Sequence, residues 1–81
     1  MEQEVISILK DAFHGIEINI EELPGERISG FVVWDGFAGL DHVDRQNKIR
    51  TLLKKQLGAK AQQVGVLPTY TPDELRAMNA A

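Results

Sequence analysis

The sequence predicts a single α+β domain over residues 1–81 with the element order αββαβα, in which helices cover one face of a three-stranded mixed sheet. Ile16, Ile18 and Ile20 alternate with polar residues, which is the period of a strand with one buried face. Residues 31–34 form an unbroken apolar run, as expected of a central strand. Residues 41–57 carry the longest helical pattern in the chain. These three patterns together indicate a sheet packed against a long helix.

The first two strands are expected to form a hairpin behind an N-terminal helix. Apolar residues at helical spacing predict that helix over Glu2–His14. The strands are expected at residues 16–21 and 28–34, antiparallel to each other, with the Pro-Gly pair at 24–25 in the turn between them. Gly30 interrupts the second strand, and a glycine there indicates a bulge or a close approach of two backbones.

The long helix has a defined start and a defined end. Asp41 is expected to cap it by accepting a backbone N–H, and the negative charge of Asp44 in the first turn suits the helix dipole. Gly58 is expected to end it, since glycine adopts the left-handed conformation that helix ends often need. The apolar side expected to face the sheet consists of Val43, Ile49, Leu52, Leu53 and Leu57.

A third strand and a short helix are expected after the long helix. The strand is predicted near Gln62 to Leu67, parallel to the second strand, because a helical crossover between parallel strands is almost always right-handed. The last helix begins with a capping box, in which Thr71 caps, Pro72 takes the first helical position and Glu74 reaches back to the cap.

Length and composition limit the classes of protein to consider. With 81 residues, 43% of them hydrophobic, the chain has room for one small core. It has no cysteine, which excludes a disulfide framework, thiolate catalysis and metal sites built on its own cysteines. No apolar run approaches the roughly 20 residues of a membrane span, and no signal-peptide pattern opens the chain. We therefore expect a cytoplasmic protein that does not enter a membrane.

Charge is unevenly distributed along the chain. Residues 1–26 carry seven acidic side chains and one lysine, which gives −6, whereas residues 45–60 carry six basic side chains and no acidic one, which gives +6. Such asymmetry indicates a cationic side that faces a partner, or a basic helix that neutralises an acidic hairpin of the same domain. The expected partner-binding or nucleic-acid-binding residues are Arg45, Gln46, Lys48, Arg50, Lys54, Lys55 and Lys60.

No pattern in the sequence indicates an enzyme. His14 and His42 have no neighbour in sequence that would make a nucleophile pair or a metal cage with them. Glu21 and Glu22 are adjacent in an expected strand, so their side chains point to opposite faces and do not form a carboxylate pair. We expect no catalytic residue, no metal site and no cofactor.

Residues 36–39 spell Gly-Phe-Ala-Gly, which matches the GxxG loop with which KH domains clamp a nucleic-acid backbone. The element order also resembles that of type II KH domains. A KH loop lies between two helices and usually brings a basic residue, whereas the middle of this segment is apolar. Phe37 is therefore interpreted as a core residue in preference to part of a nucleic-acid clamp.

A fairly specific motif, F-x-G-L-x-x-V-x-R-Q followed by T-P-x-E, is contained in the residues Val32-Val33, Asp35, Phe37, Gly39-Leu40, Val43, Arg45-Gln46, Ile49, Tyr70-Thr71-Pro72 and Glu74. In these residues the chain, from Trp34 onward, resembles the BolA family, in particular its IbaG-like branch. The helix and hairpin ahead of the motif fit the same fold. The resemblance implies a small cytoplasmic adaptor or regulator without catalysis of its own. It also implies work with monothiol glutaredoxins in iron–sulfur handling, and some family members are described as nucleic-acid-binding regulators.

Two positions depart from the family pattern. The family's cluster-binding histidine lies eight residues before the threonine of the T-P pair, and Gln63 stands at that place. The family's second ligand, a Cys or His between the first two strands, has no counterpart in residues 24–27. An amide oxygen is a poor ligand for cluster iron, where imidazole or thiolate is preferred. We therefore expect an adaptor that binds a protein such as a monothiol glutaredoxin without supplying iron–sulfur ligands.

A second hypothesis is a KH-like regulator that binds DNA or RNA through the basic helix at residues 43–57. The two hypotheses predict different salt dependence, because each phosphate contact releases counterions and protein docking through mixed contacts need not. The sequence leaves both the choice of partner and the oligomeric state open.

Overall fold

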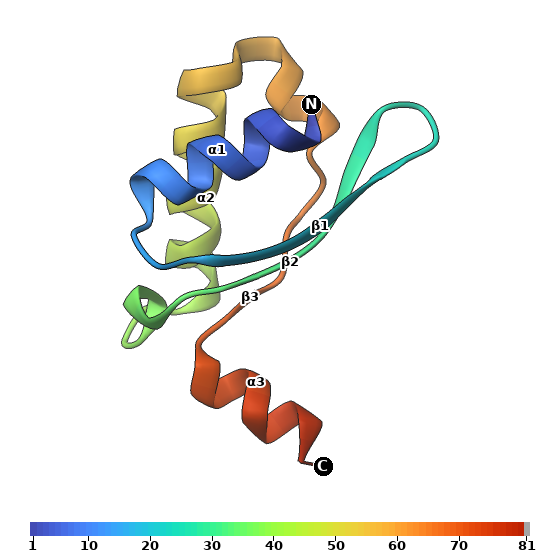
Figure 1. The fold of residues 1–81 in the computed structure, drawn as a ribbon. Helices are drawn as coiled ribbons and strands as arrows, with labels where there is room; N and C mark the ends of the chain where they lie inside the picture. The colour runs from blue at the N-terminus through green and yellow to red at the C-terminus, as the bar shows by residue number, and fades with distance from the viewer. Residues whose placement is uncertain (81) are drawn as a thin grey trace.

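The computed structural model describes residues 1–80, and its elements follow the predicted order αββαβα (Figure 1). They are α1 (Glu2–Ala12), β1 (Glu17–Leu23), β2 (Arg27–Val33), the 3-10 helix η1 (Asp35–Phe37), α2 (His42–Leu57), the 3-10 helix η2 (Gly58–Gln63), β3 (Thr69–Tyr70) and α3 (Pro72–Asn79). The α+β class and the mixed sheet are therefore confirmed.

The sheet has the order β1-β2-β3, so β2 is central. β1 and β2 pair antiparallel from Glu17 opposite Val33 to Leu23 opposite Arg27, without a bulge in the register. β2 and β3 pair in parallel, with Val32 opposite Thr69. The central position of β2 agrees with its apolar run, because a strand with neighbours on both sides has little contact with water.

The third strand was predicted too early in the chain. Residues 58–63 form η2, and Val64 makes only an isolated parallel bridge to Ile28. Pro68 has no N–H to donate, although its carbonyl accepts a hydrogen bond from the Val32 N–H at 3.0 Å. A regular ladder therefore forms only beyond Pro68, at Thr69–Tyr70.

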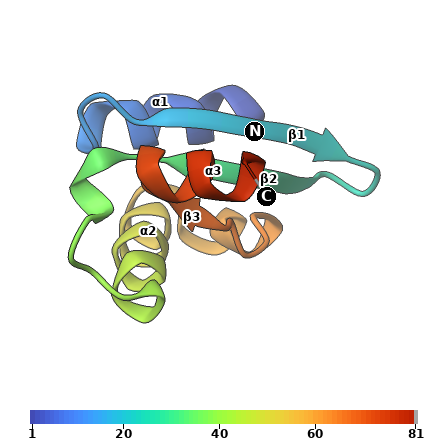
Figure 2. The same cartoon turned by 90° about the horizontal axis from the view of Figure 1, so that it is seen from below.

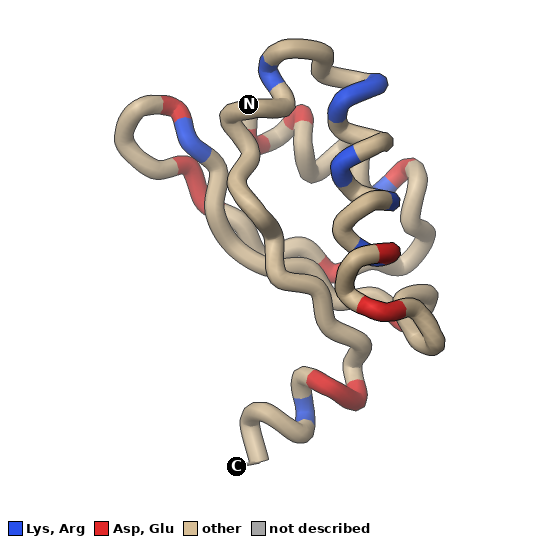
Figure 3. Tube along the Cα trace, turned by 180° about the vertical axis from the view of Figure 1, so that it is seen from behind, with Lys and Arg blue, Asp and Glu red and all other residues tan. Residues whose placement is uncertain are grey.

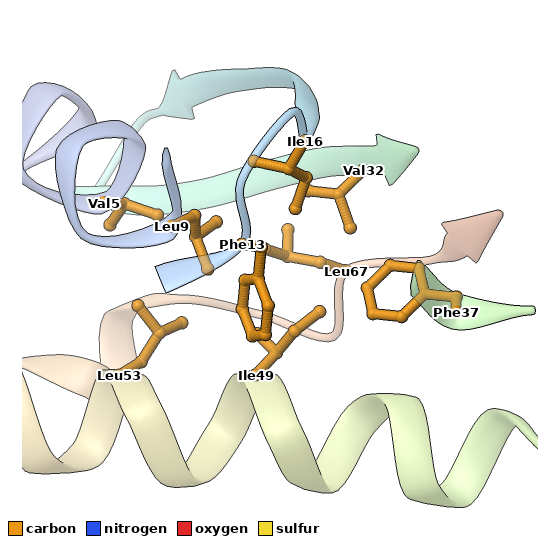
Figure 4. Packing of buried hydrophobic residues seen from close by; sticks show 9 residues of the cluster. All are labelled: Val5, Leu9, Phe13, Ile16, Val32, Phe37, Ile49, Leu53 and Leu67. Carbon is orange, nitrogen blue, oxygen red and sulfur yellow. The ribbon is translucent and has the colours of Figure 1, made fainter. Parts of the chain in front are cut away.

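One face of the sheet carries the hydrophobic core. α1 and α2 pack on this face, where Val32 of the central strand and Leu53 of α2 are both buried (Figure 4). Phe37 is fully buried, which confirms its interpretation as a core residue. The buried cluster consists of Val5, Leu9, Phe13, Ile16, Val32, Phe37, Ile49, Leu53 and Leu67.

The third helix is the exception to the single-faced arrangement. α3 leaves the end of β3 on the side of the sheet away from α1 and α2 (Figures 1 and 2). Its start is the predicted capping box: the Glu74 N–H donates to Thr71 Oγ1 at 3.2 Å, and the Thr71 N–H donates to Glu74 Oε1 at 2.9 Å. Because the cap follows the strand directly, no loop carries the chain back to the core side.

The limits of α2 agree with the sequence, but one residue of its expected apolar side does not. Asp41 Oδ1 accepts from the Asp44 N–H at 2.8 Å, and Gly58 ends the helix with a φ of 58°. Val43 is 67% exposed, and the buried side of the first turns is instead occupied by Arg45. Arg45 lies four residues before Ile49, so it is the residue that the helical period places on the buried side.

One buried hydroxyl predicts a stabilising substitution. Thr69 is 2% exposed, and its Oγ1 has no hydrogen-bond partner among residues 1–80. Thr69→Val replaces the hydroxyl by a methyl group of similar size and removes the cost of a buried unsatisfied polar atom. We expect the free energy of unfolding to rise by about 1 kcal/mol in denaturant titrations. A decrease of similar size would mean that the hydroxyl has a partner.

Within residues 1–80, no helix combines the length and the apolar character needed to cross a bilayer.

Candidate functional site

Four of the predicted binding residues lie exposed on α2. The helix places Lys48 and Lys55 on one edge of its exposed surface and Arg50 and Lys54 on the other, because seven residues are close to two helical turns and four are close to one. Figure 3 shows the positions of the basic residues, in blue, spread along this part of the chain. No carboxylate within residues 1–80 forms a salt bridge with any of these four. The exposed cationic surface is therefore two separate strips.

Arg45 does not belong to that surface, contrary to the prediction. It is 3% exposed, and its Nε donates to the Leu40 carbonyl at 2.9 Å. Its Nη1 donates to the Thr69 carbonyl at 3.3 Å, and the guanidinium lies 5.7 Å from the centre of the Phe37 ring. These contacts join α2 to β3 and to the segment after η1, so the role of Arg45 is structural.

Gln46, also predicted to bind a partner, uses its side chain for a hydrogen bond inside the fold. Its Nε2 donates to the Leu67 carbonyl at 2.7 Å, and the side chain is half-buried. This bond ties α2 to the chain that leads into β3. Gln46 thus helps to hold the connection between α2 and β3 in place.

Arg45 also holds α3. Its Nη1 and Nη2 donate to the two carboxylate oxygens of Glu74 at 2.7 and 3.0 Å, a bidentate pair. These bonds from Arg45, together with the hydrogen bond from the Thr71 N–H, lower the pKa of Glu74 from 4.5 to about 2. None of residues 72–79 is buried, so this pair and the capping box are the main polar connections of α3 to the rest of the fold.

The Glu74 carboxylate predicts a specific acid sensitivity. Because the folded-state pKa lies below the ordinary value of 4.5, the stabilisation is complete above that pH and is lost as the pH falls from about 4.5 towards 2. Glu74→Gln removes this component at every pH. The advantage of the wild type over Glu74→Gln in denaturant midpoint should therefore shrink through that window. If the difference in denaturant midpoint between the two proteins stayed constant from about pH 6 to about pH 2, the Arg45–Glu74 pair would not be the cause.

Gln63 lies in an acidic groove beside the β1–β2 hairpin. The groove is lined by Gln63 and Lys60 from η2, by Glu22 and Glu26 from the hairpin, and by Glu4 from α1. The fold thus brings Gln63 close to the hairpin, although the two are far apart in sequence. Lys60, expected on the cationic surface, instead lines this groove together with the three glutamates.

The donor set of this groove does not fit an iron–sulfur cluster. It is lined by carboxylates, an amide and two ammonium groups, those of Lys60 and of the Met1 N-terminus, which pairs with Glu4 and Glu22, whereas cluster iron takes thiolate or imidazole. His14 and His42 do not line the groove; both are exposed, one just beyond α1 and the other at the start of α2. Among residues 1–80, no group of three or more His, Asp or Glu side chains is arranged to hold a metal ion.

The Gly-Phe-Ala-Gly segment at residues 36–39 covers the last two residues of η1 and the start of the turn that leads to α2, and it serves packing. A Cβ at Gly36 would overlap the ring of Trp34, and that ring packs edge-on against Phe37 with centroids 5.2 Å apart. The Trp34 Nε1 donates to the His14 carbonyl at 2.8 Å, which ties this segment to the end of α1. The need for close packing therefore accounts for the first glycine without a phosphate ligand.

A shallow groove between α1 and α2 carried no signal in the sequence. Figure 1 shows α1 passing across α2. The groove is lined mainly by residues of these two helices, Lys48 and Lys55 among them. Phe13, Leu40 and Leu52 contribute its apolar lining. Its residues come from three separate segments, so only the crossing of the two helices brings them together.

No protein-family model matches the chain, and no curated protein is significantly similar to it.

Proposed function

We propose that this chain is a BolA-like, non-catalytic adaptor that binds a protein partner such as a monothiol glutaredoxin and supplies no iron–sulfur ligand. The observation that carries the proposal is the position of Gln63 beside the β1–β2 hairpin. The resembled family draws its two ligands from these two places, and this chain carries an amide and carboxylates there. In this proposal the chain docks on its partner without ligating a cluster.

Two further observations support an adaptor. The αββαβα order and the mixed sheet agree with the fold that the resemblance implies. Arg45, Thr71 and Glu74, all part of the pattern that carries the resemblance, join in one network of hydrogen bonds between α2, β3 and the start of α3. These three residues of the motif thus have a role in the architecture, which supports a non-catalytic adaptor.

Spectroscopy of a cluster-loaded monothiol glutaredoxin tests the proposal. The wild-type chain should form a complex, detected by size-exclusion chromatography, while the visible absorption and circular dichroism of the cluster stay almost unchanged. Gln63→His should change both spectra, because it returns an imidazole to a position that its neighbours already hold. Gln62→His is the matched control: Gln62 lies outside the Gln63 groove, so its imidazole should leave the spectra as they are.

The outcomes separate the two parts of the proposal. Absence of a complex would refute glutaredoxin as the partner. A strong spectral change with the wild type, removed by His42→Ala, would make His42 a ligand and refute cluster-free docking.

A KH-like nucleic-acid-binding regulator is the second candidate. It is favoured by four exposed cations that form no salt bridge with the carboxylates of residues 1–80: Lys48, Arg50, Lys54 and Lys55. Phosphate contacts of this kind produce an affinity for DNA or RNA that falls steeply with salt and does not depend on sequence. The apolar middle of residues 36–39 and the internal use of Arg45 make this candidate weaker.

A further inference from the structure

The groove between α1 and α2 combines apolar lining with cationic edges. It has a volume of about 600 Å3 and opens widely to solvent, with Phe13 at the end of α1 and Leu40 before α2 among its lining residues. Leu40 and Leu52 are half-buried and supply its accessible apolar surface, whereas Phe13 is 8% exposed and belongs mainly to the core. Apolar side chains that remain partly accessible beside charged ones are typical of surfaces that bind another protein segment.

The two lysines of the groove have a regular spacing. Lys48 and Lys55 are seven residues apart, about 10 Å along the helix axis, and Leu52 lies between them on the same side of α2. No carboxylate of residues 1–80 forms a salt bridge with either lysine. The groove thus offers two lysines on either side of an apolar contact, and Asp44, which also lines it four residues before Lys48, offsets part of their charge.

We propose that this groove binds an acidic amphipathic helix of the protein partner. The apolar side of that helix would lie on Phe13, Leu40 and Leu52, and two of its carboxylates, about two turns apart, would pair with Lys48 and Lys55. A helix repeats its surface every seven residues or so, which matches the separation of the two lysines. The inference rests on the proposed adaptor function, because it specifies where and how a protein partner docks.

Two other occupants fit the groove less well. A nucleic-acid backbone would use the lysines but would leave the apolar lining of the groove unused. The α1 helix of a second copy cannot supply the apolar side, because Val5 and Leu9 are fully buried in their own core. A foreign helix with free apolar and acidic sides meets both requirements.

The test uses the complete isotope-labelled chain and a synthetic amphipathic peptide with leucines along one side and glutamates flanking them. The peptide should shift the amide resonances of Lys48, Leu52 and Lys55 and of the end of α1. Lys48→Glu combined with Lys55→Glu should weaken binding about tenfold, because it removes both ion pairs and adds repulsion. The same double variant should bind a lysine-flanked version of the peptide more tightly than the wild type does.

Arg50→Glu combined with Lys54→Glu is the matched control. It makes the same change of charge on the other edge of α2, outside the groove, and should leave the peptide affinity within about twofold of the wild type. Equal weakening by both double variants would reduce the effect to overall charge and overturn the inference. Peptide-induced shifts confined to other surfaces, or no shifts, would overturn it as well.

A short single-stranded DNA and a dilution series complete the test. Tighter binding of the DNA than of the glutamate peptide to the same resonances would assign the groove to nucleic acid. Concentration-dependent shifts of the same residues without peptide would assign it to a second copy. Because the peptide assay contains no glutaredoxin, loss of peptide binding with intact glutaredoxin binding refutes the groove alone. The opposite pattern refutes the glutaredoxin proposal and leaves the groove.

Discussion

Gly30→Ala is expected to destabilise the fold by about 3 kcal/mol or more, as the sum of backbone strain and overpacking, each of about 1–3 kcal/mol. Gly30 lies in the central strand opposite Ile20, with a φ of 146°, a conformation that side chains with a Cβ rarely adopt. A Cβ there would lie 2.6 Å from the Cα of Ile20 and would overlap the Asn19 carbonyl. Because backbone atoms occupy the space, no rotamer change of a neighbour relieves the overlap.

Thermal and denaturant unfolding measure this effect, and Gly39→Ala is its control. Gly39 also has a positive φ, of 82°, but no atom lies within 4 Å of a Cβ built there. Its substitution should therefore cost only the strain, about 1 kcal/mol. A small domain has about 5–15 kcal/mol of stability in total, so the Gly30 variant should lose a large share of it. Equal effects of the two variants would show that the close approach of β1 and β2 is not the cause.

The fold was predictable where the information is local. The isoleucine alternation of β1, the cap at Asp41 and the capping box at Thr71 are each contained within a few residues, and the structure confirms all three. The position of β3 was not predictable in this way. Val64 and Val66 alternate like a strand, but parallel pairing depends on how η2 returns the chain to β2, and Val66 is 72% exposed.

The candidate site was predictable only in part, because the prediction relied on the charge of the residues alone. Basic residues were assigned to the surface by type, whereas Arg45 is buried because it shares a helical side with Ile49 and Leu53. The spacing of Arg45 from Ile49 and Leu53 already indicated a buried position, and this spacing is a stronger indication than the charge of the residue. The residues that surround Lys60 and Gln63 could not be predicted from the sequence, because Glu22 and Glu26, which line the same groove, are far from them in sequence.

Leu53→Ala is the second large effect, expected to lower the free energy of unfolding by about 2–5 kcal/mol, as truncations of buried leucines do. Leu53 is 3% exposed and packs in the middle of the α2 side that faces the sheet (Figure 4). Val43→Ala on the same helix is the control: Val43 is 67% exposed, and alanine favours a helix more than valine does, so stability should change by less than about 0.5 kcal/mol.

The comparison between Leu53→Ala and Val43→Ala decides which side of α2 faces the core, and with it the position of the proposed groove. If Leu53 is central, its truncation leaves a cavity among Leu9, Phe13 and Ile49, which cannot all move to fill it. Lys48 and Lys55 then lie at the groove edge with Leu52 between them, as the docking proposal requires. Should denaturant midpoints show Val43→Ala to be the costlier change, α2 would be rotated about its axis. The lysines would then have moved away from Phe13, and the groove would not exist as described.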